Sequence, residues 1–203
     1  PLKGYEDKHV VEYYLSLLKE LGMEIKTTPD RAYGRLEFPI KPEDRQWVER
    51  LLPQEGIFPQ DLVIGLVPGG GASWGKDAIY KQWSSEKYAK LADKMIEKFS
   101  VKIILLGDQN DGELCRRIRG LIKGFCVDLS GRTTLGQFAA LLKRCVFNVV
   151  NDGGPLHVAV AVGAKTVSIF GPVDETVYGP YPPTETNRTH TVVKKDLACR
   201  PCY

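Results

Sequence analysis

Apolar residues near the start of the chain recur at helical spacing and then stop. Residues 5–21 place them every three or four positions, and Gly22 follows the last of them. We therefore predict an amphipathic helix that needs a partner for its apolar side. A second, short helix is expected over residues 43–52, because Pro42 suits the first turn of a helix and Pro53 does not suit its interior.

The stretch between these two helices has a different composition. Residues 26–42 are rich in Thr, Pro, Gly and charged side chains, with one brief apolar run at 36–40. This composition predicts a linker that contains one short strand.

Beyond residue 58, strand-like apolar runs alternate with helical patterns. The strands are expected at residues 62–67, 101–106, 125–129, 146–150 and 166–170. The helices are expected at residues 85–99, 112–121, 135–142 and 155–162, the first of them capped by Ser84 or Ser85. The runs are continuous rather than alternating, as in a parallel sheet buried on both sides. The fold class predicted is therefore α/β, with a Rossmann-like parallel sheet and helices on both faces.

Ligands of such sheets bind outside the carboxyl ends of the strands. The loops that leave those ends span residues 68–83, 107–111, 130–134, 151–157 and 171–176. We therefore expect the binding and catalytic residues to lie in these five loops.

Composition excludes several classes of protein. The 203 residues are 43% hydrophobic and 26% charged, which is typical of a globular domain. A net charge of +3 is too small and dispersed to indicate nucleic-acid binding, and no apolar run reaches the roughly 18 residues of a membrane span. Five cysteines are an odd number and suggest a reducing compartment. The chain begins at Pro1 without a leader pattern, so we expect no signal peptide and expect residues to precede it.

The first loop contains three consecutive glycines, at positions 69–71, followed by Lys76 and Lys81. Glycines let backbone N–H groups approach a phosphate, and the lysines would supply countercharge. The alternative is an ordinary loop with solvated lysines. The spacing matches neither a Walker A motif nor a dinucleotide fingerprint.

The fourth loop offers a second anion site. Gly153 and Gly154 expose backbone donors in front of a helix whose N-terminus carries partial positive charge, so a diphosphate could bind there. Alternatively, Asp152 is a helix N-cap and His157 an ordinary helix histidine. Two such loops at one edge of the sheet favour the phosphate interpretation.

Other candidates are weaker. Asp111 could accept hydrogen bonds from a ribose diol or could be a loop or N-cap acid, and spacing does not separate it from Asp108 and Glu113. Cys199 and Cys202 form one C-x-x-C pair, which is insufficient for a metal site or a redox centre. With no nucleophile elbow and three histidines, a catalytic triad is not supported.

Four motifs in order make the chain resemble glycosyltransferase family 9, the bacterial heptosyltransferases. K-Q-W-S at 81–84 resembles the family's K-x-W-P element, and L-S-G-R-T-T-L at 129–135 resembles its L-x-G-x-T-x-L segment. N-D-G-G-P-L-H-V-A at 151–159 is similar to N-D-S/T-G-x-x-H-x-A, and F-G-P follows at 170–172. The C-x-P-C ending is also typical of many members.

The resemblance implies a GT-B architecture, in which two Rossmann-like domains face each other across a cleft. Residues 58–203 would be the C-terminal, nucleotide-sugar-binding domain, and residues 1–57 a remnant of the N-terminal domain with the interdomain linker. The residues that it implies bind the donor are Ala72, Ser73, Asp111, Thr133, Asp152, Gly153, Gly154 and His157. Lys81 would be catalytic, stabilising the diphosphate as it leaves.

The activity implied is transfer of heptose from ADP-heptose to a lipopolysaccharide core or lipid A precursor, with inversion and without a metal or other cofactor. The general base would come from the missing N-terminal domain, and no nucleic acid is involved. The implied location is cytoplasmic, peripheral at the inner face of the inner membrane. Gly153 and Val173 stand where the family favours hydroxyl residues. These departures leave two alternatives: a GT-B transferase with another nucleotide-sugar, and a non-catalytic nucleotide-binding module.

Overall fold

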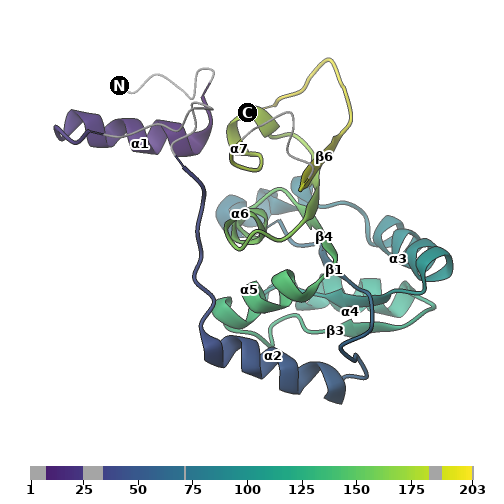
Figure 1. Ribbon diagram of the computed structural model, residues 1–203. Helices are drawn as coiled ribbons and strands as arrows, with labels where there is room; N and C mark the ends of the chain where they lie inside the picture. The colour runs from purple at the N-terminus through teal and green to yellow at the C-terminus, as the bar shows by residue number, and fades with distance from the viewer. Residues whose placement is uncertain (1–7, 25–33, 71, 183–188, 203) are drawn as a thin grey trace.

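The computed structural model describes residues 8–24, 34–70, 72–182 and 189–202, which contain a six-stranded sheet whose neighbouring strands are all parallel (Figure 1). The strand order is β3-β2-β1-β4-β5-β6. The strands are β1 Val63–Val67, β2 Lys102–Leu105, β3 Cys126–Asp128, β4 Phe147–Asn151, β5 Thr166–Phe170 and β6 His190–Lys194. Five of them were predicted within one or two residues. Strand β6 was missed because it is largely exposed at the edge of the sheet and has only two apolar residues, Val192 and Val193.

Helices cover both faces of this sheet. They are α1 Val10–Glu20, α2 Pro42–Gln54, α3 Ser85–Phe99, α4 Gly112–Leu121, α5 Leu135–Arg144, α6 Gly154–Ala161 and α7 Glu175–Tyr178, with a 3₁₀ segment, η1 Ala72–Lys81. Helices α2, α5 and α6 bury their apolar sides in one core, and α3 and α4 do so in another. The expected α/β class with a Rossmann-like sheet is confirmed.

The residues of β1 show why the strands read as continuous apolar runs. Val63 and Val67 point into the core beneath α2, α5 and α6, whereas Ile64 and Leu66 point into the core beneath α3 and α4. All four side chains are buried because both faces of the strand are covered. The sheet is thereby held rigid beneath the loops at its carboxyl edge.

Side-chain caps define where two of the helices that follow these loops begin. The Ser84 hydroxyl accepts the N–H of Lys87 at the start of α3. Thr134 and Gln137 form a capping box at the start of α5, each side chain bonding the other residue's backbone N–H. These caps fix the ends of the loops that precede the helices.

The predicted strand at 36–40 is wrong. The segment is extended but pairs with no strand in the described part of the chain. Leu36, Phe38 and Ile40 pack against the core on the α2 side, and the Phe38 N–H donates to Ala161 O at 3.2 Å. The alternation of apolar residues reflects packing on one side rather than a hydrogen-bonded ladder.

Two helix boundaries also differ from the prediction. Helix α2 continues through Pro53 to Gln54, because a proline in the last turn costs one hydrogen bond without ending the helix. Helix α1 begins at Val10 rather than residue 5, since the His9 imidazole caps it by accepting the Val11 N–H. Residues 5–7 lie outside the described part.

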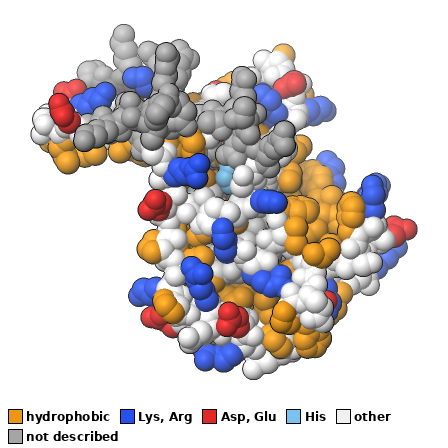
Figure 2. Space-filling model, viewed as in Figure 1, with side chains coloured by type: hydrophobic (Ala, Val, Ile, Leu, Met, Phe, Trp, Pro, Cys, Tyr) orange, Lys and Arg blue, Asp and Glu red, His pale blue; other side chains and the backbone are white. Residues whose placement is uncertain are grey.

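Helix α1 stands apart from the sheet, and residues 34–41 run extended into α2 (Figure 1). It has no buried residue. Tyr14 and Leu17 are exposed, whereas Val11, Leu15 and Leu18 are half-buried. Figure 2 shows hydrophobic side chains in a row along its lower side. The apolar side of the predicted amphipathic helix is therefore only partly covered.

Candidate functional site

The carboxyl ends of β1 and β4 form the topological switch point of the sheet. The chain adds β2 and β3 on one side of β1 and then returns to add β4, β5 and β6 on the other. The loops that leave β1 and β4 consequently diverge, and the space between them is where ligands of doubly wound sheets bind. The glycine-rich loop at 68–70 and the Asp152–Gly154 turn both lie here.

A buried ion pair links the two loops. Lys81, at the end of η1, places Nζ 2.8 Å from Asp152 Oδ2, and their side chains are only 6% and 3% exposed. Asp152 does not cap α6, whose N-cap is Gly153 without any side-chain bond. Asp152 Oδ2 accepts no directed hydrogen bond from the described residues. Burying two charges carries a large desolvation cost, so removing either partner would leave an uncompensated buried charge.

His157 lies on α6 beside this ion pair. Burial lowers its pKa, the charges of His9 and Lys81 lower it further, and Asp152 opposes them. His9 reaches the same neighbourhood from the cap of α1. Its Nε2 bonds Gly179 O at 2.9 Å and its ring packs on Tyr181, while burial lowers its pKa too. His9 was not predicted from the sequence, because no local motif indicates a histidine whose hydrogen-bond partner is 170 residues away in the chain.

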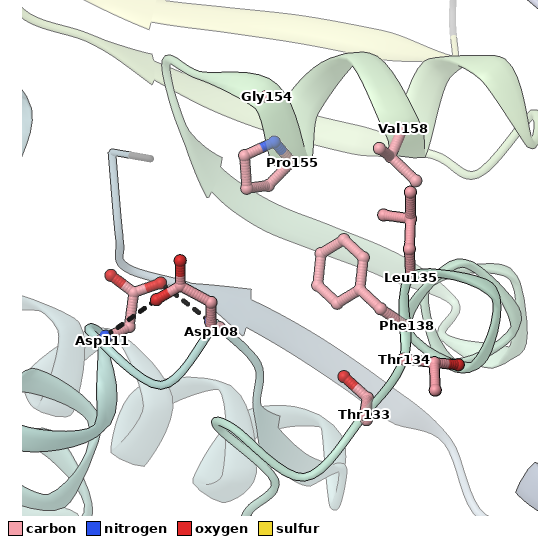
Figure 3. Close-up of a pocket in the computed structure, with 10 residues that line it drawn as sticks. Asp108, Asp111, Thr133, Thr134, Leu135, Phe138, Gly154, Pro155 and Val158 are labelled. Atoms are coloured by element: carbon pink, nitrogen blue, oxygen red, sulfur yellow. Dashed lines mark hydrogen bonds between the residues drawn. The ribbon is translucent and has the colours of Figure 1, made fainter. Parts of the chain in front are cut away.

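A cavity of about 390 Å³ opens next to the switch point (Figure 3). It collects three of the predicted donor-binding residues, Asp111, Thr133 and Gly154, from the loops after β2, β3 and β4. The rest of its lining, which was not among the predicted donor-binding residues, is Gly107, Asp108, Thr134, Leu135, Phe138, Pro155 and Val158. Figure 3 shows the two aspartates on one side and the apolar side chains on the other.

Asp111 forms the polar wall of this cavity. It occupies the N-cap position of α4 without bonding a helix N–H, and its carboxylate accepts the Asp108 N–H at 3.1 Å. Burial raises the pKa of Asp111, the hydrogen bond from the Asp108 N–H opposes this rise, and the negative charge of Asp108 adds to it. A Cβ on Gly69 would lie 2.1 Å from Asp111 Oδ1, so the loop after β1 needs a glycine at this close approach.

The other predicted site residues lie in or next to the same two loops. Ala72 and Ser73 begin η1, which is kinked at Gly75, and their side chains lie outside the described part. Gly153 is buried at the turn before α6. Val173 packs in the core and does not line the cavity. The family favours a hydroxyl residue at this position, but valine there removes no polar group from the cavity wall.

The loop after β5 is held by the end of the chain. Arg200 donates to Gly171 O at 2.7 Å, to Val173 O at 2.8 Å and to Glu175 Oε2 at 2.6 Å. Burial opposes ionisation of Glu175, but hydrogen bonds from Lys194 and Arg200 lower its pKa to about 2. No motif marks Arg200 beyond its place inside C-x-P-C.

The cysteines that flank Arg200 are both exposed thiols. Among the described residues, His, Cys, Asp and Glu form no group of three that could hold a metal ion. None of the described helices is both long and apolar enough to cross a membrane.

The fold and the arrangement of this edge are those of an α/β protein with a ligand site at its switch point. The sequence profile of glycosyltransferase family 9 (heptosyltransferase) matches residues 2–202, and the chain belongs to this family. The recognition made from the motifs is therefore confirmed.

Individual relatives agree with this assignment. The chain is 29% identical over 201 residues to lipooligosaccharide heptosyltransferase 2 of Campylobacter jejuni, covering 98% of this chain and 56% of that protein. Its fold is similar to that of a family 9 glycosyl transferase from Veillonella parvula, with a TM-score of 0.77 and 24% identity over 95% of this chain and 51% of the other. For E. coli ADP-heptose LPS heptosyltransferase II the TM-score is 0.63 and the identity 25%, over 77% and 44%.

The chain spans about half the length of the relatives that it matches. The α/β fold of this chain, with its parallel sheet, matches about half of each GT-B heptosyltransferase structure.

Proposed function

We propose that this chain is the donor-binding half of a heptosyltransferase, which binds ADP-heptose and presents its anomeric carbon to a lipopolysaccharide core or lipid A precursor. The observation that carries the proposal is the cavity shared by Asp111, Thr133 and Gly154, which opens beside the buried Lys81–Asp152 pair. The similarity to an ADP-heptose LPS heptosyltransferase supports the choice of donor and acceptor.

The cavity walls suit a nucleoside. Leu135, Phe138 and Val158 provide an apolar surface for a flat base, and the backbone near Thr133 would meet the edge of the adenine. On the opposite wall, the Asp111 carboxylate would accept hydrogen bonds from the ribose hydroxyls. Apolar walls with a few placed polar groups are what small-ligand sites provide.

The diphosphate would lie where the cavity meets the start of α6. Gly154 is exposed, and its N–H group could face an anion at the start of this helix, where the dipole favours negative charge. Pro155 has no N–H group and the Leu156 N–H donates to Gly153 O at 3.1 Å, so Gly153 and Gly154 would supply the backbone donors. Lys81 would place an ammonium beside the diphosphate, oriented by Asp152, with His157 next to both. Ala72 and Ser73 would complete this pocket.

The chemistry proposed is displacement at the anomeric carbon with inversion, and ADP-sugar as the only small-molecule requirement. Negative charge accumulates on the leaving ADP, so Lys81 and the loop N–H groups would stabilise the transition state more than the ground state. A carboxylate of the N-terminal half would remove the acceptor proton. Residues 58–203 would form the donor domain, with 1–57 the linker and a remnant of the other half, and the enzyme would work in the cytoplasm at the inner face of the membrane.

Calorimetric titration of the chain with ADP, and with UDP as the control, tests the donor site. We expect ADP to bind about tenfold more tightly than UDP, and Lys81→Ala to weaken ADP binding by about tenfold or more. Lys102→Ala is the matched control, because Lys102 pairs with Asp61 at 2.7 Å but lies at the amino edge. Failure of both nucleotides to bind, or unchanged affinity in Lys81→Ala, would contradict the proposal.

A further inference from the structure

Two asparagines of β4 are buried at opposite ends of the strand. Asn148 and Asn151 are both 0% exposed. The Asn148 amide donates to Leu142 O at 3.0 Å and Lys165 O at 3.4 Å, near the amino edge. The Asn151 amide lies at the carboxyl edge, where both of its ends are bonded: Nδ2 donates to Pro68 O and Oδ1 accepts the Tyr88 hydroxyl at 2.8 Å.

Asn151 therefore connects three pieces of the chain beneath the candidate site. Pro68 is the first residue after β1 and begins the glycine-rich loop. Tyr88 belongs to the first turn of α3 and packs edge-on against Trp83, with ring centroids 5.1 Å apart. The residue after Asn151 is Asp152, the partner of Lys81. A single amide side chain thus ties the loop after β1 to the loop after β4 and to the helix that follows Lys81.

The bonds in this connection have no substitute nearby. The Tyr88 side chain is fully buried, so its hydroxyl has no access to solvent. A buried donor or acceptor that loses its partner cannot turn to water, and the surrounding backbone must move to satisfy it. The loop after β1 has little room for such movement, because Gly69 already lies against the Asp111 carboxylate.

We propose that Asn151 and Tyr88 are positioning residues, which hold the glycine-rich loop and the Lys81–Asp152 pair in the geometry that receives the nucleotide diphosphate. The identity of the ligand rests on the proposed function, whereas the connection itself does not. Neither side chain lines the cavity, so each acts through the groups that it holds. Rigid support of this kind keeps a site in its binding geometry before the ligand arrives.

The test compares Asn151→Ala with Asn148→Ala, which removes an equally buried amide from the same strand. We expect Asn151→Ala to weaken ADP binding by about tenfold and Tyr88→Phe, which removes one hydroxyl, by about threefold to tenfold. Asn148→Ala should lose stability yet change ADP affinity less than about twofold. The double variant Tyr88→Phe/Asn151→Ala should bind ADP no more weakly than Asn151→Ala, because the two side chains act as one unit.

Hydrogen exchange provides a readout that needs no nucleotide. In the free chain, amides of residues 66–70 and 152–154 should exchange faster in Asn151→Ala and Tyr88→Phe than in Asn148→Ala. Equal exchange in all three variants, or equal loss of ADP affinity in Asn148→Ala and Asn151→Ala, would overturn the positioning role. If the wild-type chain binds no ADP, the proposed function fails, and the exchange comparison alone decides the positioning role. Tyr88→Phe keeps the test decisive if Asn151→Ala does not fold.

Discussion

The two edges of the sheet each carry a lysine–aspartate pair, and the two pairs are built differently. At the amino edge, Lys102 is 2.7 Å from Asp61, donates to Gly56 O at 2.6 Å and lies over the rings of Phe58 and Phe125. The side chains of Lys102 and Asp61 are each about one-fifth exposed. At the carboxyl edge, Lys81 and Asp152 are almost completely buried, and Asp152 Oδ2 receives no directed hydrogen bond from the described residues.

The difference lies in the access of each pair to water. A partly solvated pair keeps much of its hydration and contributes little to stability. A deeply buried pair loses its hydration, so removing one partner leaves an uncompensated buried charge and should destabilise the protein strongly. The candidate site therefore contains the pair whose disruption should have the larger effect, and the pair at the amino edge should be easier to replace.

Breaking each pair should give the largest contrast. Lys81→Met leaves the Asp152 carboxylate buried without its partner, and we expect a loss of about 3–5 kcal/mol in the free energy of unfolding. Lys102→Met should lose less, because water reaches Asp61. Urea denaturation of the two variants measures the difference.

The double variant Lys81→Met/Asp152→Leu sharpens this contrast. Apolar residues of similar size often replace a buried pair without loss of stability, so the double variant should recover most of what Lys81→Met loses. It should still bind no ADP, since the ammonium is gone. Recovery of ADP binding together with stability would show that the pair is structural.

Adding one methyl group at the carboxyl edge and another in the middle of β1 should separate packing from function. A Cβ at Gly69 would meet Asp111 Oδ1 at 2.1 Å, and a Cβ at Gly65 would meet Asn148 Oδ1 at 2.2 Å. Gly69→Ala and Gly65→Ala should each destabilise the protein by about 1–3 kcal/mol, because the neighbouring polar side chain must move. Only Gly69→Ala should weaken ADP binding, and calorimetry of both variants checks this.

Loosening the end of the chain should have a smaller effect confined to the carboxyl edge. Arg200→Gln removes two bonds to the loop after β5 and one to Glu175, and we expect a loss of about 1–2 kcal/mol in the free energy of unfolding. Arg117→Gln is the control, since its partner Glu86 is exposed. Thermal unfolding should show a drop in Tm for Arg200→Gln and almost none for Arg117→Gln.

Acid should reveal the smallest contribution, that of Glu175. Because the folded-state pKa is lowered to about 2 from an ordinary value of 4.5, ionised Glu175 stabilises the fold fully above that ordinary value. The contribution should disappear as the pH falls from 4.5 towards 2. The free energy of unfolding of Glu175→Gln should therefore decline less than that of the wild type over this range, and parallel profiles would contradict the prediction.

Much of the fold could be predicted because it follows from local patterns of apolar and polar residues. Helices α3 and α4 and strand β5 have the predicted bounds, since each has a clear apolar periodicity and a recognisable start or end. The errors fall where the pattern of apolar residues does not match the neighbours that the segment has in the fold. Residues 36–40 alternate like a strand but pack without a neighbouring strand in the described part of the chain. Strand β6 is too exposed to need a continuous apolar run.

The candidate site could be predicted only in part. Motifs and loop positions singled out Lys81, Asp111, Thr133, Asp152 and Gly154, which the structure places at one edge of the sheet. The apolar lining residue Phe138 was missed, because it reads as an ordinary core position of α5. The contacts of Asn151 and Arg200 were not predicted either. The partners of Asn151 are 63 and 83 residues away in the chain, and those of Arg200 are 25–29 residues away.

The sequence by itself determined the first five strands and the helices between them, in their order along the chain. It also determined the family and the loops that carry glycine, lysine and aspartate. Those properties depend on neighbouring residues, whose spacing sets the period of the backbone and the charge of each loop. Only the tertiary structure decided that Lys81 pairs with Asp152, that Gly69 yields space to Asp111 and that Asn151 joins Pro68 to Tyr88. Such pairings depend on which strands become neighbours in the sheet. Once these polar groups are buried, leaving any of them without a partner costs free energy, and this cost favours the one arrangement in which they are paired.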